Sequence, residues 1–326
     1  MPLLQDNTQR VKFLSPAFLK ASFFLLTSCC PSPRDRRTVI DRVYELFWNN
    51  LFISYICMCI KSLPGGAPTE QARCHGGKVM RMFNQKQICS MPQTLFRAKR
   101  IVLHIPHSSP VFPNGYNYWS NGIGDYIARW TDWYTDWIFC SAAMGDVRIV
   151  PVIFPFSRFF CDVERLENDP LESIGQGIIY TDFGKCHRRI KNDEIEKLLK
   201  LYYHPFMDRL RCNLHPSAFL LDCHSFPYDL SDVDVCIGYN NDWSQPEAKI
   251  LTKTESIFKG QGLKTGLNHP YSHSLSPRMP FSYPSMMIEL NKKTYMSESG
   301  ELDYEKMKTI INSLHRVFSL ILDGDI

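Results

Sequence analysis

Two histidines of this chain follow directly on short apolar runs, a position from which an imidazole can do chemistry. His107 comes after the run at 100–105 and His224 after the run at 218–223, and a serine follows each histidine. Apolar runs of this length are typical of buried strands, whose carboxyl ends meet at one edge of a parallel sheet. A histidine after a strand is usually structural, but two at one edge with acids nearby form a donor set that suits zinc. The pattern predicts a zinc site that contains His107 and His224.

A pair of aspartates offers a third ligand for this site. Asp132 and Asp136 are four residues apart in an aromatic segment that predicts one helix over 125–144, so both would lie on the same face of that helix. The surrounding tryptophans indicate that the helix is largely buried, and a buried carboxylate needs a cation or hydrogen-bond donors. We expect one of the two to be the ligand. We favour Asp132, because it is nearer the start of the helix, where the chain leaves the loop after His107.

One acid occurs in the middle of an apolar strand. Glu289 is the fourth residue of the run Met-Met-Ile-Glu-Leu at 286–290. Burying a carboxylate without a partner is costly. Glu289 is therefore expected to be either the general base beside a zinc-activated water or one half of a buried ion pair, and we favour the general base. We also expect Asp222, close to His224, to orient an imidazole.

Two arginines bracket a short acidic segment. Arg158 and Arg165 enclose Asp162 and Glu164. A guanidinium group is suited to holding a substrate carboxylate in a two-pronged contact, or to stabilising a tetrahedral oxyanion. We assign Arg158 to catalysis and Arg165 to substrate binding. The alternative is that the two arginines simply pair with Asp162 and Glu164.

These candidates depend on strands that alternate with helices. Apolar runs predict strands at 100–105, 147–154, 218–223, 233–238 and 286–290. Amphipathic or aromatic patterns predict helices at 125–144, 191–210, 244–260 and 304–322. Alternation of this kind is typical of an α/β protein. We predict a three-layer sandwich, in which helices cover both faces of a mixed, mostly parallel sheet.

The chain divides into two parts of different character. Among its 326 residues, residues 1–95 have no sustained hydrophobic period and carry twelve Lys and Arg against five Asp and Glu. We expect this part to be an appendage, either a disordered leader or the result of a start codon set too far upstream. Residues 96–326 are expected to form the catalytic domain. The six cysteines of this second part lack Cys-x-x-Cys spacing and are expected to be reduced and buried.

Composition and charge exclude several classes of protein. With 44% hydrophobic and 21% charged residues, the chain is globular rather than disordered. Residues 96–326 carry no basic stripe, so we expect no nucleic-acid partner. No apolar stretch reaches the about 18 residues of a membrane-spanning helix. We expect a cytoplasmic enzyme that acts on a small molecule and needs no protein partner. A lipoprotein or secreted form is the alternative, because Leu-Thr-Ser-Cys at 26–29 resembles a lipoprotein cleavage box.

The order of the motifs resembles the N-formylglutamate amidohydrolase family. The similar segments lie at 105–108, 131–136, 157–165, 221–225, 268–271 and 288–296. The resemblance implies a fold similar to that of zinc carboxypeptidases and zinc-dependent cell-wall amidases, with a zinc site formed by a histidine, an acid and a histidine, and a catalytic glutamate. These roles fall on His107, the Asp132/Asp136 pair, His224 and Glu289.

The resemblance also implies substrate contacts at Asn268 and Tyr271, in the segment Asn-His-Pro-Tyr. We therefore predict a zinc-dependent amidohydrolase that cleaves the C–N amide bond of a small N-acyl amino acid resembling N-formylglutamate. Two alternatives stay open. One is a zinc peptidase or cell-wall amidase, and the other is a metal-free binding protein on the same fold.

Overall fold

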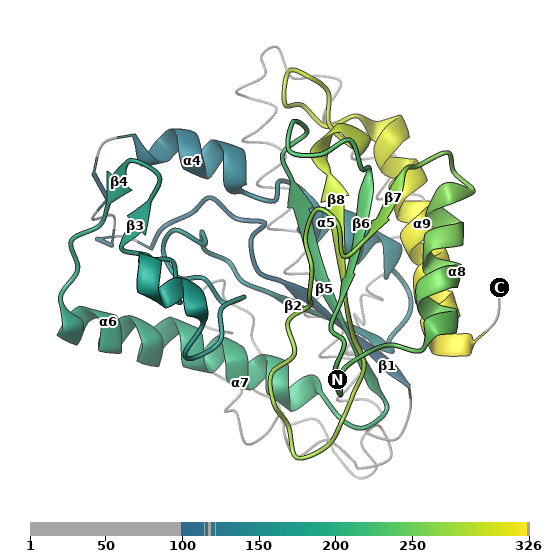
Figure 1. Ribbon diagram of the computed structural model, residues 1–326, viewed down its shortest axis with the longest axis horizontal. Helices are drawn as coiled ribbons and strands as arrows, with labels where there is room; N and C mark the ends of the chain where they lie inside the picture. Colours follow the sequence, from purple (N-terminus) through teal and green to yellow (C-terminus); the bar gives the residue numbers. More distant parts are fainter. Residues whose placement is uncertain (1–98, 114, 117–118, 121, 325–326) are drawn as a thin grey trace, which may run out of the picture. The chain divides into compact units, whose positions relative to one another are not determined.

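A six-stranded sheet forms the centre of the computed structural model, which describes residues 99–324 other than 114, 117, 118 and 121 (Figure 1). The strands follow one another across the sheet in the order β2-β1-β5-β8-β6-β7. Their bounds are β1 Arg100–Ile105, β2 Ile149–Ile153, β5 Ala218–Phe226, β6 Val235–Tyr239, β7 Thr265–Leu267 and β8 Ser285–Asn291.

The sheet is mixed and mostly parallel, as predicted. The pairs β1·β2, β1·β5, β5·β8 and β6·β7 are parallel, and β6 runs antiparallel to β8. The register sets polar residues side by side in the middle of the sheet. His104 of β1 is opposite Asp222 of β5, and His224 of β5 is opposite Glu289 of β8. Four chemically active side chains therefore come together through strand pairing alone.

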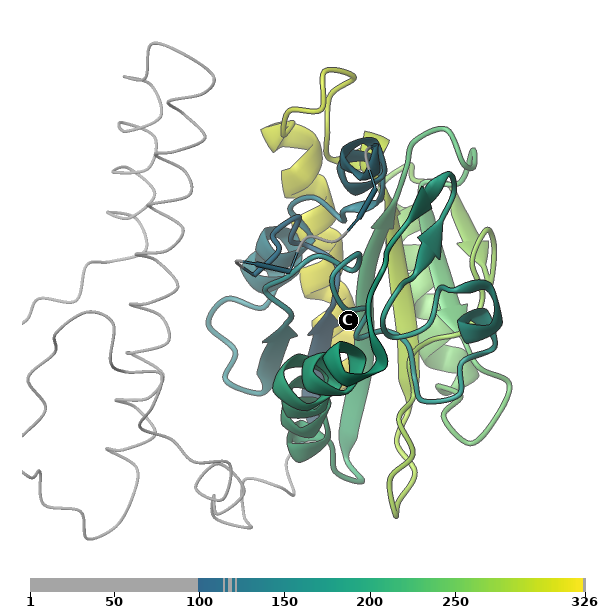
Figure 2. The same ribbon diagram turned by 90° about the vertical axis from the view of Figure 1, so that its left-hand side faces the viewer.

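Helices cover both faces of the sheet and complete the three layers. Helices α5 (Thr135–Ala142), α8 (Ala248–Lys259) and α9 (Tyr304–Asp323) pack on one face. On the other face lie α6 (Asn192–Leu198) and α7 (His204–Asn213), which the π-helical turn η4 (Leu199–Tyr203) joins into one rod, in front of the sheet in Figure 2. Each face has its own apolar core, so the predicted sandwich is confirmed.

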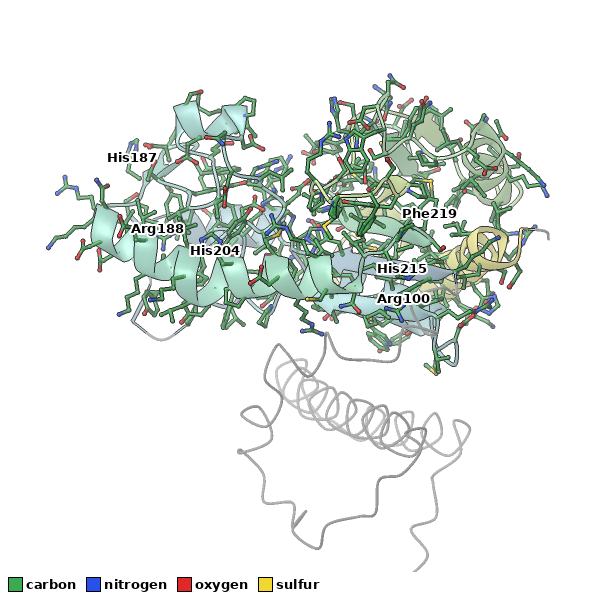
Figure 3. All side chains as sticks on the ribbon, turned by 90° about the horizontal axis from the view of Figure 1, so that it is seen from below. Arg100, His187, Arg188, His204, His215 and Phe219 are labelled. Atoms are coloured by element: carbon green, nitrogen blue, oxygen red, sulfur yellow. The ribbon has the colours of Figure 1, made fainter. Side chains whose placement is uncertain are left out.

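The two ends of the sheet differ in chemistry. Arg100 is the first residue of β1 and Phe219 the second residue of β5, and both lie with His215 at the amino end of these strands (Figure 3). Burial lowers the pKa of His215, and Arg100 adds to that shift. The residues singled out for catalysis, by contrast, lie toward the carboxyl ends of the strands, where α/β proteins usually place their sites.

One predicted element is wrong. The structure has two helices, α4 (Ile123–Trp130) and α5, where the sequence predicted a single helix over 125–144. Between them Asp132 donates its backbone N–H to the carbonyl oxygen of His107 at 2.9 Å, and Tyr134 adopts a left-handed φ of 65°. The contact with His107 comes from a segment distant in sequence and overrides the local helical preference. Asp132 and Asp136 therefore do not share a helix face.

Smaller elements were missing from the prediction because they are too short to show a period. They are η3 (Pro170–Ile174), the hairpin β3 (Asp182–Phe183) and β4 (Cys186–His187), strand β7, and the turn η5 (Lys292–Thr294). Four of the six later cysteines are buried, as expected, whereas Cys140 and Cys212 are only half-buried. None of the helices in the described part of the chain has the length and apolar character needed to cross a bilayer. The expected appendage, 1–95, lies outside the described residues.

Candidate metal centre

One face of the sheet changes from apolar to polar along its length. On β5, Leu221 and Cys223 belong to the core under α5, α8 and α9. The alternating residues Asp222 and His224 point to the opposite face, since successive side chains of a strand alternate. On β8 the same alternation places Glu289 on the face of His224. All three polar side chains are nonetheless buried, with at most 8% exposed. Several ionisable groups are therefore buried in one place at a cost in stability, which is typical of functional sites.

The structure brings His107, Asp132 and His224 together. One potential ligand atom from each lies within 4.8 Å of the others. The Asp132 carboxylate is 3.2 Å from Nδ1 of His224 and 3.7 Å from Nδ1 of His107. Nδ1 of His107 is buried and has no hydrogen-bond partner among the described residues. Asp136 lies elsewhere, in the first turn of α5, where its carboxylate accepts the backbone N–H of Trp137.

A second carboxylate holds each imidazole from its other side. Nε2 of His107 is 2.8 Å from Asp162, and Nε2 of His224 is 2.8 Å from Asp222. When Nε2 donates to the carboxylate, the Nδ1 lone pair is left facing Asp132. Carboxylates in this position fix the ring and raise the basicity of a metal ligand. The role of Asp222 agrees with the sequence-based expectation, whereas the contact of Asp162 with His107 was not predicted.

The two histidines carry different charges. Burial, reinforced by Arg158, lowers the pKa of His107, so this ring is neutral and ready to act as a ligand. Burial would also lower the pKa of His224, but the carboxylates of Asp222 and Glu164 outweigh it and raise this pKa well above the usual range. A cation that bound here would therefore displace a proton from His224, as metals commonly do at histidine sites.

Three groups of residues in the described structure have metal-ligand spacing, and the first fits zinc best. His107, Asp132 and His224 offer two imidazoles, one carboxylate and an orphaned nitrogen, which is the donor set of catalytic zinc sites. In the second group, formed by His104, Asp222 and His224, the two rings already share one oxygen of Asp222. In the third, formed by His107, Asp162 and Glu164, the acids pair with arginines.

Glu289 lies beside the candidate ligands. Burial raises its pKa to about 8, although His224 acts in the opposite direction. Its Oε2 atom is buried and has no hydrogen-bond partner among residues 99–324 that the structure describes. A carboxyl group whose pKa lies near neutral pH, with an oxygen left free, can exchange a proton with a substrate or with water. Among the described residues, no arginine or lysine is hydrogen-bonded to Glu289, and none of them forms the buried ion pair considered above.

Arg158 and Arg165 lie at the edge of the same cluster. Arg158 is 3.2 Å from Asp162 and 3.4 Å from Glu164. Arg165 is 3.7 Å from Asp162 and 3.8 Å from Glu164. The pairing that the sequence offered as an alternative is therefore present. The pairing leaves Nε of both arginines without a hydrogen-bond partner among the described residues, although Nε of Arg165 is the atom that lies 3.7 Å from Asp162.

The two residues expected to contact substrate differ in their surroundings. The Asn268 side chain accepts the backbone N–H of Tyr239 at 2.8 Å, and Asn268 itself has a left-handed φ of 49°. It thus secures the loop after β7 to the end of β6. Tyr271 is half-buried, with its ring centroid 5.9 Å from that of Phe226. Burial raises the pKa of Tyr271, and the charge of Glu289 raises it further, so the phenol is protonated near the site.

Two functional candidates were missed in the sequence. Nδ1 of His104, fully buried on β1, is 2.7 Å from Asp222 and helps to hold it. Lys292 is 7% exposed, and its ammonium donates to the carbonyl oxygen of Arg129 at 2.5 Å. Burial lowers the pKa of Lys292 to about 8. The signal for His104 was an ionisable side chain within an apolar run, which is also the signal that identified Glu289. A lysine after a strand gives no such signal.

Comparison with known proteins agrees with this architecture. The family model described as N-formylglutamate amidohydrolase matches residues 99–296. The crystal structure of N-formylglutamate amidohydrolase from Ralstonia eutropha JMP134 is similar, with a TM-score of 0.60 and 19% identity over 70% of this chain and 94% of that chain. A gene product from Agrobacterium tumefaciens gives a TM-score of 0.54 and 16% identity over 69% of this chain and 91% of that one. None of the curated proteins matches the sequence.

Proposed function

This chain belongs to the N-formylglutamate amidohydrolase family, and from that premise we propose that it is a zinc-dependent enzyme that hydrolyses the C–N amide bond of a small N-acyl amino acid. The observation that carries the proposal is the convergence of His107, Asp132 and His224 beside Glu289. The family match supports a hydrolase of carbon–nitrogen bonds. The zinc and the residue roles below are our inference from the geometry.

The proposed metal ligands are His107, Asp132 and His224. Zinc, when bound, supplies a Lewis acid that activates water and polarises the amide carbonyl. The protein's part is to turn the two imidazoles so that Nδ1 of each ring faces the metal position. Asp162 and Asp222 do this by accepting from the far nitrogen of each ring. Asp222 is held in turn by His104 and by the backbone N–H of Leu275 at 2.9 Å.

Glu289 is the proposed general base. It would take a proton from the attacking water and deliver it to the leaving amine nitrogen, so that one carboxyl group serves both halves of the reaction. Its raised pKa favours the second half, because a carboxyl group that holds its proton near neutral pH can protonate an amine. A divalent cation at the neighbouring ligands would lower this pKa and favour the first half.

The remaining predicted residues would bind the substrate. Arg158 is proposed to stabilise the oxyanion and Arg165 to hold the substrate carboxylate, each through the nitrogen that has no partner among the described residues. Tyr271 would donate its phenolic hydrogen to the substrate. Asn268 contributes by shaping the loop that carries Tyr271, because its side chain is already bonded to Tyr239.

A substrate panel tests this proposal. The purified protein would be stripped with a chelator, reloaded with zinc, and assayed on N-formyl amino acids, N-acetyl amino acids, dipeptides and a cell-wall muramoyl peptide. We expect turnover of N-acyl amino acids that is lost on stripping and regained with zinc. Turnover confined to peptides or muramoyl peptides would indicate a peptidase or cell-wall amidase instead. Retention of zinc without turnover of any substrate would contradict the enzyme assignment.

A further inference from the structure

Glu164 stands between the two arginines and the two histidines of the site. Its carboxylate is 3.4 Å from Arg158 and 3.8 Å from Arg165. It is also 3.8 Å from Nε2 of His107 and from Nε2 of His224. The Glu164 side chain is 21% exposed, whereas that of its neighbour Asp162 is fully buried. A ligand that arrives from solvent therefore meets the charge of Glu164.

The positive charges of the two arginines are already balanced. Asp162 and Glu164 bring two negative charges within 3.8 Å of Arg158 and Arg165. A ligand carboxylate that approached either guanidinium would meet the carboxylate of Glu164 at a comparable distance. In a partly buried site, where charges are weakly screened, that repulsion offsets much of the attraction.

The other charged groups around the site do not supply a surplus cation. The Lys292 ammonium is held by the carbonyl oxygen of Arg129, and its charge is balanced by the nearby acid Asp132. A divalent ion bound between the histidines would offset the remaining acids and leave the site close to neutral. Hydrogen-bond donors for one anionic group do remain. Among the described residues, Nε of Arg158 and Nε of Arg165 have no hydrogen-bond partner, and Nε of Arg165 lies 3.7 Å from Asp162.

We propose that Glu164 selects the substrate by charge, so that the site takes N-acyl amino acids with one carboxylate and disfavours those with a second. The inference rests on the proposed amide hydrolysis and names its substrate class. The free arginine donors receive the single carboxylate or the oxyanion. A second carboxylate finds no unbalanced cation and is repelled by Glu164.

A matched pair of substrates tests the selection. N-formylglutamate and N-formylglutamine have nearly the same shape, but the first carries two carboxylates and the second carries one. We expect the zinc-loaded wild-type protein to show the higher kcat/KM for N-formylglutamine. Glu164→Gln keeps the size of the side chain and removes its charge. It should shift the ratio of the two kcat/KM values toward N-formylglutamate by on the order of tenfold or more, the usual scale of a charged hydrogen bond.

Binding measured by calorimetry separates this inference from the proposed reaction. Glutarate and its half-amide, glutaramate, reproduce the charge difference without the N-acyl bond of the substrates. The wild type should bind glutaramate more tightly, and Glu164→Gln should shift the ratio of the two dissociation constants toward glutarate by a similar factor. The matched control is Glu196→Gln, which removes one charge from the exposed side of α6 and should leave both ratios unchanged.

The outcomes are distinguishable. If the binding ratio shifts as described while neither formyl compound is hydrolysed, the charge selection holds and the proposed function fails. The selection is overturned if the wild type binds glutarate as tightly as glutaramate, or if it binds neither. It is also overturned if a folded Glu164→Gln protein shows the wild-type ratios. The wild-type measurement decides the matter alone should the variant fail to fold.

Discussion

Each imidazole of the candidate centre is hydrogen-bonded to a carboxylate in the structure. Asp162 accepts from His107 on one side of the site, and Asp222 accepts from His224 on the other. Asp162 also accepts the phenol of the buried Tyr180 at 2.6 Å. Side chains tied at two points lose little further freedom when a metal binds, so the geometry favours a preformed site over one assembled by its ion.

Two matched substitutions distinguish Asp132, the proposed zinc ligand, from the nearby Asp136. Asp132→Asn should lower zinc retention after gel filtration by 10-fold or more, since an amide is a poor substitute for a carboxylate ligand. Asp136→Asn is the matched control and should retain the wild-type zinc content, because Asp136 lies in α5 and contacts Trp137. Metal analysis of both proteins decides. Equal zinc content in the two variants would remove Asp132 from the site.

The buried acid Glu289 predicts a dependence of stability on pH in the zinc-free protein. The ordinary pKa of 4.5 applies in the unfolded chain, while burial raises the pKa to about 8 in the folded one. Between these values the folded state holds a proton that the unfolded state has lost, so the free energy of unfolding falls as pH rises. Urea titrations from pH 5 to pH 8 should show this decline, and Glu289→Gln should reduce it by on the order of a few kcal/mol. A variant with the wild-type slope would contradict the raised pKa.

The break between α4 and α5 is the element that places Asp132. In a continuous helix the backbone N–H of Asp132 would donate to a carbonyl oxygen of the preceding turn. Here it donates to the carbonyl oxygen of His107 instead. Two threonine hydroxyls support the break. Thr131 donates to the carbonyl oxygen of Ile127 at 2.7 Å, and Thr135 donates to that of Asp132 at 2.8 Å. Each of these carbonyl oxygens also accepts the backbone N–H of the same threonine, so each threonine is held to the break by two hydrogen bonds.

Loss of the Thr135 hydroxyl should therefore weaken zinc binding at the metal centre. Thr135→Val keeps the shape of the buried side chain and removes its hydrogen bond to Asp132. We expect a loss of about 1 kcal/mol in the free energy of unfolding and a weaker affinity for zinc in a competition titration with a chelator. Thr252→Val is the control, since Thr252 lies on the exposed side of α8 and donates to a carbonyl oxygen of the same helix. If both variants bind zinc like the wild type, the break does not position Asp132.

Much of this element structure follows from the sequence, and the part that does not has a physical reason. The strands that carry His224 and Glu289 were identified because apolar runs and residue alternation are local signals. The break before α5 was missed because the bond between Asp132 and His107 is a tertiary contact. For the same reason the sequence indicated that Asp162 pairs with an arginine, but not that it also orients His107.

On the scale of the whole molecule, the two faces of the sheet differ. One face carries an apolar core, and the other carries the candidate site as well as a core. The core under α5, α8 and α9 is apolar from Phe219 to Cys223 on β5 and from Met286 to Leu290 on β8. The opposite side is apolar where α7 packs, then turns polar at Asp222, His224 and Glu289. Apolar cores on both faces thus offset the cost of the charges buried at the carboxyl end of one of them.

The proposed domain boundary gives a test at this scale. Because β1 begins at Arg100 and the family match begins at residue 99, a chain that starts at Met91 should contain all that the domain needs. We expect it to be expressed in soluble form, to unfold within a few degrees of the full chain, and to keep its zinc and its kcat/KM. Insoluble or inactive protein would mean that the segment before Met91 is required by the catalytic domain.

The central claim is that Glu289 moves the proton in a reaction that zinc makes possible, and one variant tests it most directly. Glu289→Gln keeps the shape and volume of the side chain but cannot accept a proton. With zinc bound, we predict that kcat on the best N-acyl amino acid falls by on the order of 100-fold or more, while zinc content and the unfolding midpoint are not reduced. A Glu289→Gln protein that retains zinc and turns over at a rate close to the wild type would contradict the account.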